Sequence, residues 1–225
     1  RAKYCRYTAG VDALGKGELE KAAEQLKLAE DYEDAAEKFG DAARTLGHAA
    51  METGEYQTAI RWLEQLPHEG ETGKTLNQAI YAYADQLEQE GQKEAAATEF
   101  YSLGGYQDAQ TRGNALEYAL AMEEKVADVE SALERFELLG DYQDAKAQAE
   151  ACRYAIAQKA FEQGQFEDAL EGFSALGDYQ DAKAQVQRCR YALAQAAYEQ
   201  GDYAGAAALF EACAAYLHAE DGVLR

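Results

Sequence analysis

A heptapeptide recurs along this chain at a fixed spacing. Leu-Gly-Asp-Tyr-Gln-Asp-Ala occurs unchanged at residues 139–145 and 176–182, which lie 37 residues apart. A near-copy occupies residues 103–109, and a shorter one occupies residues 31–35. Self-similarity at a period of about 20–50 residues is typical of solenoids, in which each repeat packs on its neighbours. The spacing therefore predicts a repeat array.

A glycine followed five residues later by alanine marks the middle of most repeats, as in Gly164 with Ala169. Large residues recur four positions after that alanine or its counterpart: Leu26, Leu63, Phe100, Phe136, Phe173 and Phe210. Another apolar residue usually follows three positions later. Spacings of three and four residues place these side chains on one face of a helix of about 11 residues. Nothing between Asp144 and Gln163 would break a helix, which predicts a longer first helix of about 20 residues.

The heptapeptide is interpreted as the corner between two repeats. Its leucine ends the short helix, and Gly140 or Gly177 is expected to take a positive φ in the left-handed region that terminates helices. Asp141 or Asp178 is predicted to cap the next helix, while the aspartate three residues later adds favourable charge in its first turn. A metal or acid–base site built from the paired aspartates is the alternative. Helix stop and start signals explain them more simply.

One pattern recurs along the chain: glycine, any residue, tyrosine or phenylalanine, any two residues, alanine, any three residues and phenylalanine. This pattern resembles the tetratricopeptide repeat. Gly164, Phe166, Ala169 and Phe173 match it well. The resemblance implies an all-α fold, a right-handed α-solenoid of about six helix hairpins with a long first and a short second helix. The chain departs from that pattern in its period of 37 rather than 34, its missing proline and its longer first helix. Leu-Gly-Asp-Tyr repeats are also similar to those of bacterial surface or regulatory proteins.

The predicted domain organisation is a single array over residues 1–225. A truncated repeat over 1–30 is followed by repeats at 31–67, 68–104, 105–140, 141–177 and 178–214, with the start of a further one at 215–225. Because the sequence opens in the middle of a repeat, we expect it to be a segment of a longer protein. It contains no signal peptide or membrane span, and either a cytoplasmic or a cell-surface location fits.

Proteins with tetratricopeptide repeats bind peptides in a concave groove lined by first helices, so the resemblance implies a protein-binding scaffold. The tyrosine that recurs in the first helices would lie on or beside this groove, and the candidates for partner contact are Tyr81, Tyr118, Tyr154 and Tyr191. The alternative is that so regular a residue serves packing between repeats. Arg44, which replaces this tyrosine in one helix, and His48 are further candidates, beside an irregular corner at residues 66–72 that could also reflect drift.

The chain carries 42 acidic and 21 basic residues, a net charge of −21. This disfavours nucleic acid and anionic membranes, because phosphate contacts require clustered lysine and arginine. The expected partner is a protein or peptide, and a basic one would complement the charge, although such a balance is also typical of a solvated surface. The rival function is a structural spacer that positions other domains of a larger bacterial protein.

Catalysis, metals and cofactors have no support in the sequence. The three histidines lie in different hairpins without nucleophile or carboxylate partners at motif spacing, and no phosphate-binding loop is present. Cys5, Cys152 and Cys189 occupy equivalent repeat positions. Helices in neighbouring repeats pack about 8–10 Å apart, too far for a disulfide, so these cysteines are expected to be small buried thiols. We therefore expect a non-enzymatic protein.

Overall fold

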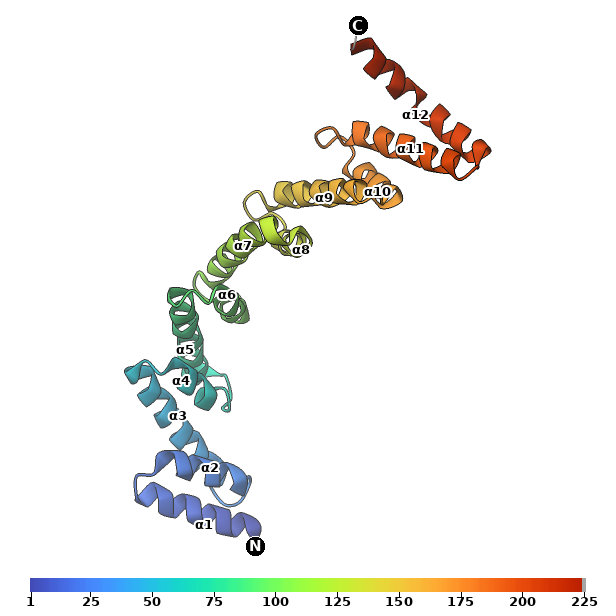
Figure 1. The fold of residues 1–225 in the computed structure, drawn as a ribbon. Helices are drawn as coiled ribbons and strands as arrows, with labels where there is room; N and C mark the ends of the chain where they lie inside the picture. Colours follow the sequence, from blue (N-terminus) through green and yellow to red (C-terminus); the bar gives the residue numbers. More distant parts are fainter. Residues whose placement is uncertain (224–225) are drawn as a thin grey trace. The chain divides into compact units, whose positions relative to one another are not determined.

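The computed structural model describes the backbone of residues 1–223 and the side chains of residues 1–213. Over this range the chain forms twelve α-helices and no strands, so the predicted all-α fold is confirmed. The helices alternate in length and form six consecutive hairpins (Figure 1). Sequential helices pack on one another within each half of the chain, as expected of a solenoid-like repeat fold.

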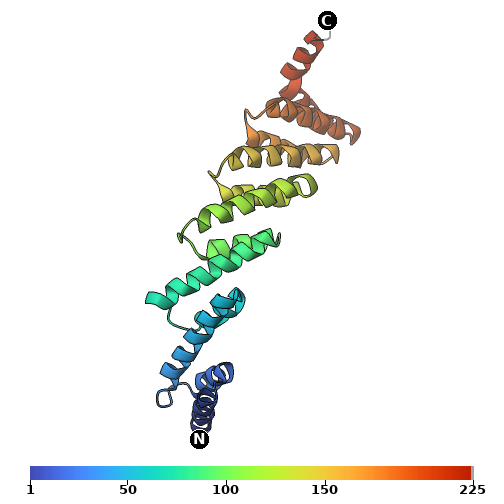
Figure 2. The same ribbon diagram turned by 90° about the vertical axis from the view of Figure 1, so that its left-hand side faces the viewer.

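Two compact units make up the chain, unit 1 at Arg1–Leu116 and unit 2 at Glu117–Arg225. The helices of unit 1 are α1 (Ala2–Gly15), α2 (Leu19–Ala29), α3 (Ala35–Thr53), α4 (Tyr56–Leu63), α5 (Gly70–Gln89) and α6 (Lys93–Ser102). The boundary falls within α7 (Ala109–Ala127). Unit 2 continues with α8 (Val129–Leu139), α9 (Ala145–Glu162), α10 (Phe166–Leu176), α11 (Ala182–Glu199) and α12 (Tyr203–Val223). Figure 2 shows the succession of hairpins in each unit from the side.

The predicted helix lengths are confirmed for most hairpins. First helices α3, α5, α7, α9 and α11 have 18–20 residues, and second helices α2, α4, α6, α8 and α10 have 8–11. Two helices depart from these lengths: α1 has 14 residues, and α12 continues to Val223 and passes the expected repeat end at residue 214. The side chains of the expected further repeat at 215–225 lie outside the described ones. The prediction of one continuous array stays a prediction.

The core of each unit comes from the apolar face that the spacing predicted. Phe100, Phe136 and Phe173 are at most 1% exposed and pack against small buried residues of the neighbouring first helices. Ala96, Ala132 and Ala169, four residues before them, are fully buried as well. Because a buried aromatic residue contributes a large apolar area, these rings dominate the packing between helices.

We call the corner between two hairpins a joint and name it by its helices. In the α10/α11 joint, residues 177–181, two hydrogen-bonded turns follow one another. Tyr179 N–H donates to Leu176 C=O at 3.1 Å, and Ala182 N–H donates to Tyr179 C=O at 3.0 Å. Gly177 has φ +58° and ψ −111°, the geometry of the first central residue of a type II′ turn. The predicted positive φ is confirmed, but the left-handed helical conformation expected there is wrong because ψ is negative.

The predicted helix caps are also wrong. Helices α9 and α11 begin after Asp144 and Asp181, three residues later than Asp141 and Asp178, because the second turn delays the helix start. None of these aspartates accepts a side-chain capping bond, within the described structure. Asp141 instead forms an ion pair with Lys146 at 2.5 Å.

The four cysteines are free thiols, but their burial differs. Cys152, Cys189 and Cys213 are fully buried, as expected for the repeat position of the first two. Burial raises the pKa of the Cys152 and Cys189 thiols. Cys5 is exposed, so its expected burial is wrong. It lies on α1, and in the described structure no hairpin precedes that helix.

Candidate functional site

The repeated tyrosines connect each hairpin to the next one. In four joints the tyrosine hydroxyl of a first helix donates to the aspartate before the next first helix: Tyr7 to Asp34, Tyr81 to Asp108, Tyr118 to Asp144 and Tyr154 to Asp181. The oxygen–oxygen distances lie between 2.5 and 2.8 Å. We call this contact the tyrosine–aspartate bond. The aspartates that were assigned to helix starts thus hold a joint through their side chains.

The tyrosine rings are packed as well. The ring of Tyr118 lies edge-on to Phe136 at 5.7 Å between centroids and to Tyr142 of the heptapeptide at 6.0 Å. Tyr154 makes the equivalent contacts with Phe173 at 5.3 Å and Tyr179 at 5.9 Å. Edge-on aromatic pairs stabilise a structure by about 0.5–1.5 kcal/mol beyond their buried area.

The hydrogen bonds shift the ionisation of both partners. The bond to Asp181 raises the pKa of Tyr154, and the bonds from Tyr154 and Gln185 lower the pKa of Asp181. The bond to Asp144 likewise raises the pKa of Tyr118. Each shift favours the neutral phenol facing the carboxylate.

The geometry thus gives Tyr81, Tyr118 and Tyr154 a role in packing between hairpins. Tyr191 packs on Phe210 at 5.5 Å, and the residue one period after Asp181 lies outside the described side chains. Contact of these tyrosines with a partner stays a prediction.

Arg112 is a residue of the α6/α7 joint (103–108 and the start of α7) that the sequence reasoning missed. It donates to the Tyr81 hydroxyl at 3.1 Å and forms ion pairs with Asp85 and Glu88 of α5. Its guanidinium also lies over the Phe100 ring, 4.4 Å from the centroid. The equivalent residues Lys38, Gln148 and Gln185 bind the joint aspartate itself, whereas Arg112 binds Tyr81 and the carboxylates of α5, so its role could not be predicted from its place in the repeat.

Arg44 and His48 lie four residues apart on α3 and therefore share one face of that helix. Arg44 pairs with Asp41 of the same helix at 2.5 Å, and its side chain is 43% exposed. Among the described residues, no hydrogen bond or ion pair joins either one to the irregular corner near Pro67. Their role in partner binding stays a prediction.

The α4/α5 joint, residues 64–69, is closed differently from the others. His68 Nε2 lies 3.1 Å from the carbonyl oxygen of Glu64. A Cβ at Gly73 would stand 2.3 Å from the carbonyl oxygen of His68, so glycine is required there. Glu71 occupies the place of the joint aspartate but pairs with Lys74 at 3.6 Å. In this irregular joint, a close backbone contact at Gly73 stands where four other joints have a tyrosine–aspartate bond.

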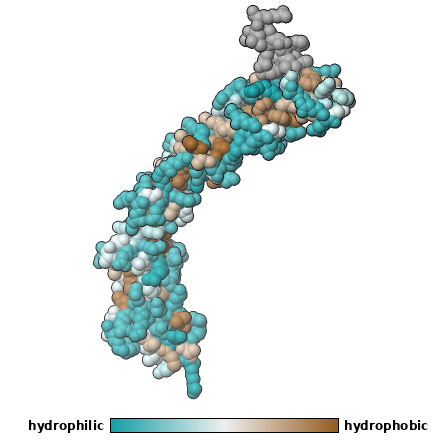
Figure 3. Space-filling model, viewed as in Figure 1, coloured by the Kyte–Doolittle hydropathy of each residue, from teal (hydrophilic) through white to brown (hydrophobic). Residues whose placement is uncertain are grey.

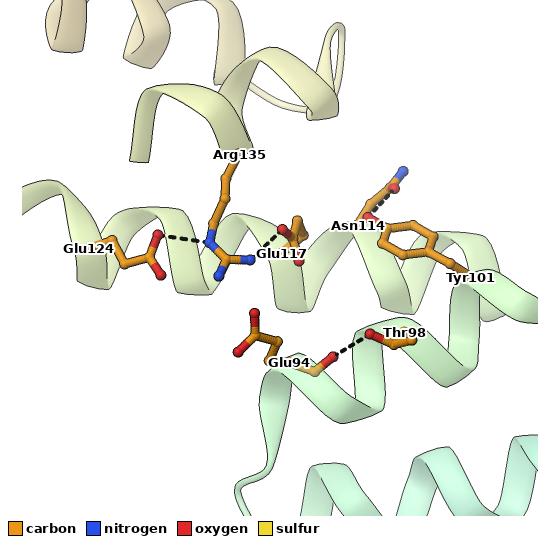
Figure 4. Close-up of polar contacts among 7 residues, drawn as sticks. All are labelled: Glu94, Thr98, Tyr101, Asn114, Glu117, Glu124 and Arg135. Carbon is orange, nitrogen blue, oxygen red and sulfur yellow. Dashed lines mark hydrogen bonds and ion pairs between the residues drawn. The ribbon is translucent and has the colours of Figure 1, made fainter. Parts of the chain in front are cut away.

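A half-buried ion-pair group holds α8 on α7 in unit 2 (Figure 4). Arg135 donates to Glu117 at 2.6 Å and to Glu124 at 2.7 Å. The arginine side chain is 19% exposed and the Glu117 side chain 13%. One arginine thus joins two carboxylates of α7 to α8, which supports a role of this group in the packing of the two helices.

A surface pocket of about 420 Å³ lies in the α8/α9 joint (residues 140–144) and the helix ends beside it. Its floor contains Phe136 and Ala149, and its rim contains Glu137, Lys146, Glu150 and Arg153. Glu137 and Arg153 form an ion pair at 2.7 Å across the two helices. We call this the Ala149 pocket. The sequence reasoning did not find it.

Hydrophilic side chains cover most of the face seen in Figure 3, and hydrophobic ones form small separate patches. In the described part of the chain no helix is long and apolar enough to cross a membrane. Nor do the described histidines, cysteines and carboxylates form a group of three or more that could hold a metal ion.

Comparison with protein-family models finds no match, and comparison with curated protein sequences finds none either. The likeness to tetratricopeptide repeats therefore rests on the residues of this chain, and what it implies about partners is a proposal.

Proposed function

We propose that the chain is a non-enzymatic protein-interaction scaffold of tetratricopeptide-like hairpins. The observation that supports this most is the closure of the joints by the chain's own tyrosine–aspartate bonds. These contacts hold successive first helices in place before any partner arrives. A surface that is already ordered loses less conformational entropy on binding, which favours affinity.

The partner we propose is a basic protein or peptide segment. The net charge of −21 attracts such a segment and raises its association rate. The contact residues proposed are those on first helices that packing does not require, with Arg44 and His48 on α3 as the first pair to examine. The exposed edges of Tyr81, Tyr118, Tyr154 and Tyr191 would add aromatic contact area beside them.

Selection from a random peptide library on the immobilised chain tests this function. We expect enrichment of basic peptides that contain an aromatic residue, with binding that weakens as salt rises from about 50 to 200 mM. The double variant Arg44→Ala, His48→Ala should change the Kd of selected peptides at least threefold if α3 takes part. A surface control, Lys74→Ala, should leave it unchanged. If the selected peptides bound no more tightly than scrambled peptides of the same charge, this would argue against the scaffold function.

The second candidate is a structural spacer that positions other domains of a larger bacterial protein. The same tyrosine–aspartate bonds favour it, because they stiffen the connection between hairpins whether or not a partner binds. Spin labels on α9 and α11 should then report a narrow distance distribution. We expect Tyr154→Phe to broaden it, and a broad distribution in the wild type would contradict a stiff spacer.

A further inference from the structure

One position in each first helix decides how a joint is filled. Counted by the 36- or 37-residue period, this position is held by Phe39, Leu76, Gly113, Ala149 and Val186. Phe39, Leu76 and Val186 belong to, or pack against, the apolar clusters of their own joints. A large apolar side chain from the first helix thus fills three of the described joints.

The α6/α7 joint uses a second solution. Gly113 has no side chain, and the ring of Tyr101 from α6 takes the space: a Cβ on Gly113 would stand 2.9 Å from Tyr101 Cε1. The Tyr101 hydroxyl donates to Asn114 Oδ1 at 3.0 Å, as Figure 4 shows. Unit 1 therefore contains a phenol seated in a joint, with its hydroxyl satisfied by the residue after the glycine.

The α8/α9 joint uses neither solution. Ala149 stands at the position of Gly113, and Glu137 stands at the position of Tyr101, 36 residues earlier. Phe136 and Ala149 pack in the apolar cluster of this joint, the Glu137 carboxylate pairs with Arg153 above them, and the surface space around this pair is the Ala149 pocket. Its volume is about 420 Å³, and it is open to solvent.

We propose that the Ala149 pocket takes the phenol ring of a tyrosine from a partner protein, in the place that Tyr101 occupies in the α6/α7 joint. This inference deepens the proposed scaffold function and rests on it. Phe136 and Ala149 form the floor for the ring. Glu150 occupies the position of Asn114, and among the side chains that the structure describes none donates a hydrogen bond to it. Its carboxylate can therefore accept the bond from the phenol hydroxyl.

Entry of a ring requires Glu137 and Arg153 to turn outward. Phe136 is fully buried and Ala149 is 3% exposed, so the charged side chains now cover the floor. The side chains of Glu137 and Arg153 are 48% and 44% exposed, and ion pairs at such exposure stabilise little. Displacement of the Glu137–Arg153 ion pair therefore costs little free energy.

The charges of the rim favour a neutral phenol over a phosphorylated one. Lys146 is engaged by Asp141 at 2.5 Å, and Arg153 by Glu137 at 2.7 Å. With Asp141 included, three carboxylates (Asp141, Glu137 and Glu150) face two cations at the rim, so the rim disfavours a phosphate, and the Glu150 carboxylate can accept a bond from a hydroxyl donor.

Titration of the isotope-labelled full chain with N-acetyl-tyrosinamide, followed by NMR, tests the proposal. We expect saturable shifts at Ala149, Glu150 and Arg153. The phenylalanine analogue should bind at least threefold more weakly, and phosphotyrosine should bind more weakly still. Ala149→Leu, which fills the pocket as Leu76 does in its own joint, should weaken binding at least tenfold. The matched control Val186→Leu should leave it unchanged.

A second variant creates the same site elsewhere. Tyr101→Ala should open a pocket beside Gly113, and the probe should then also shift Gly113 and Asn114. Shifts at the Ala149 pocket that persist unchanged in Ala149→Leu, or no shift there up to the solubility limit, would overturn the inference. If basic peptides still bound the chain in that case, the proposed function would stand without it. If the probe bound at the pocket but no peptides were enriched, the pocket would be supported and the proposed scaffold function would be contradicted.

Discussion

The α6/α7 joint of unit 1 and the α8/α9 joint of unit 2 share the tyrosine–aspartate bond but contain different side chains beside it. Tyr81–Asp108 and Tyr118–Asp144 bonds cross them, and both first-helix tyrosines pack edge-on to a fully buried phenylalanine. The apolar space beside that phenylalanine holds the Tyr101 ring in unit 1. In unit 2 the same space is the Ala149 pocket.

This difference shows that the tyrosine–aspartate bond across a joint and the side chain that occupies the joint vary independently. The hydrogen bond fixes the approach of two hairpins through residues about 27 apart in sequence. The filling depends on which side chain, from either helix, reaches the remaining space. A joint can therefore keep its geometry while the side chains over its floor change, from the Tyr101 ring in the α6/α7 joint to the Glu137–Arg153 ion pair in the α8/α9 joint.

The largest expected effect tests what the two joints share. Phe100→Ala and Phe136→Ala should each destabilise the chain by about 3–5 kcal/mol, because both rings are fully buried. Urea unfolding of the full chain measures this, and Phe173→Ala in the α10/α11 joint is the matched control with the same expectation. A near-neutral Phe136→Ala would mean that the open joint does not depend on its phenylalanine.

The next effect tests what the joints do not share. Tyr101→Ala should cost about 2–3 kcal/mol, less than a fully buried ring, because Tyr101 is half-buried and its removal leaves a gap beside Gly113. Glu137→Ala at the equivalent position should change the free energy of unfolding by less than about 0.5 kcal/mol. Equal effects of the two substitutions would remove the distinction between a filled and an open joint.

The turn at the start of each joint gives a reciprocal pair of substitutions. Gly177→Val should destabilise by about 1–2 kcal/mol, because φ is +58° at this position. Glu30 has nearly the same backbone, φ +54° and ψ −115°, in the α2/α3 joint (residues 30–34). Glu30→Gly should therefore stabilise the chain by about 1 kcal/mol, even though it removes an exposed ion pair with Lys3. Thermal unfolding of both variants checks the opposite signs.

The tyrosine–aspartate bond should have a smaller effect. Tyr154→Phe keeps the ring contacts and removes the hydroxyl, so we expect a loss of about 0.5–1.5 kcal/mol. Hydrogen exchange should locate this loss at the start of α11. Tyr198→Phe, at an exposed ring of the same helix, is the control and should be neutral. Protection at α11 that is unchanged in Tyr154→Phe would show that the packed rings alone hold the joint.

The pH dependence of stability should be the smallest effect, and its sign follows from the shifted groups. The folded pKa of Asp144 and Asp181 is lowered, so their contribution is present above the unfolded pKa of about 4 and is lost as pH falls through the folded value. The folded pKa of Tyr118 and Tyr154 is raised, so their contribution is lost as pH rises above about 10. Tyr118→Phe should flatten the alkaline side of the unfolding profile.

Much of the helical arrangement could be predicted from residue spacing. The helix lengths and the positive φ at Gly177 follow from signals within a few residues, and the structure confirms them. The capping role of Asp178 could not be judged in this way, because a second turn after it moves the helix start to Asp181. That turn includes Gln180 at φ +46°, a conformation that its residue type does not suggest.

The sequence by itself determined the all-helical repeat, because a period of 36–37 residues with apolar spacings of three and four is a local property of the chain. The contacts of the repeated tyrosines and the place of the Ala149 pocket follow only from the packing of the helices. Two features depend on helices packed together: a hydroxyl that meets an aspartate about 27 residues away, and a joint that is covered by a charged pair instead of an apolar ring. No pattern within one helix contains that information.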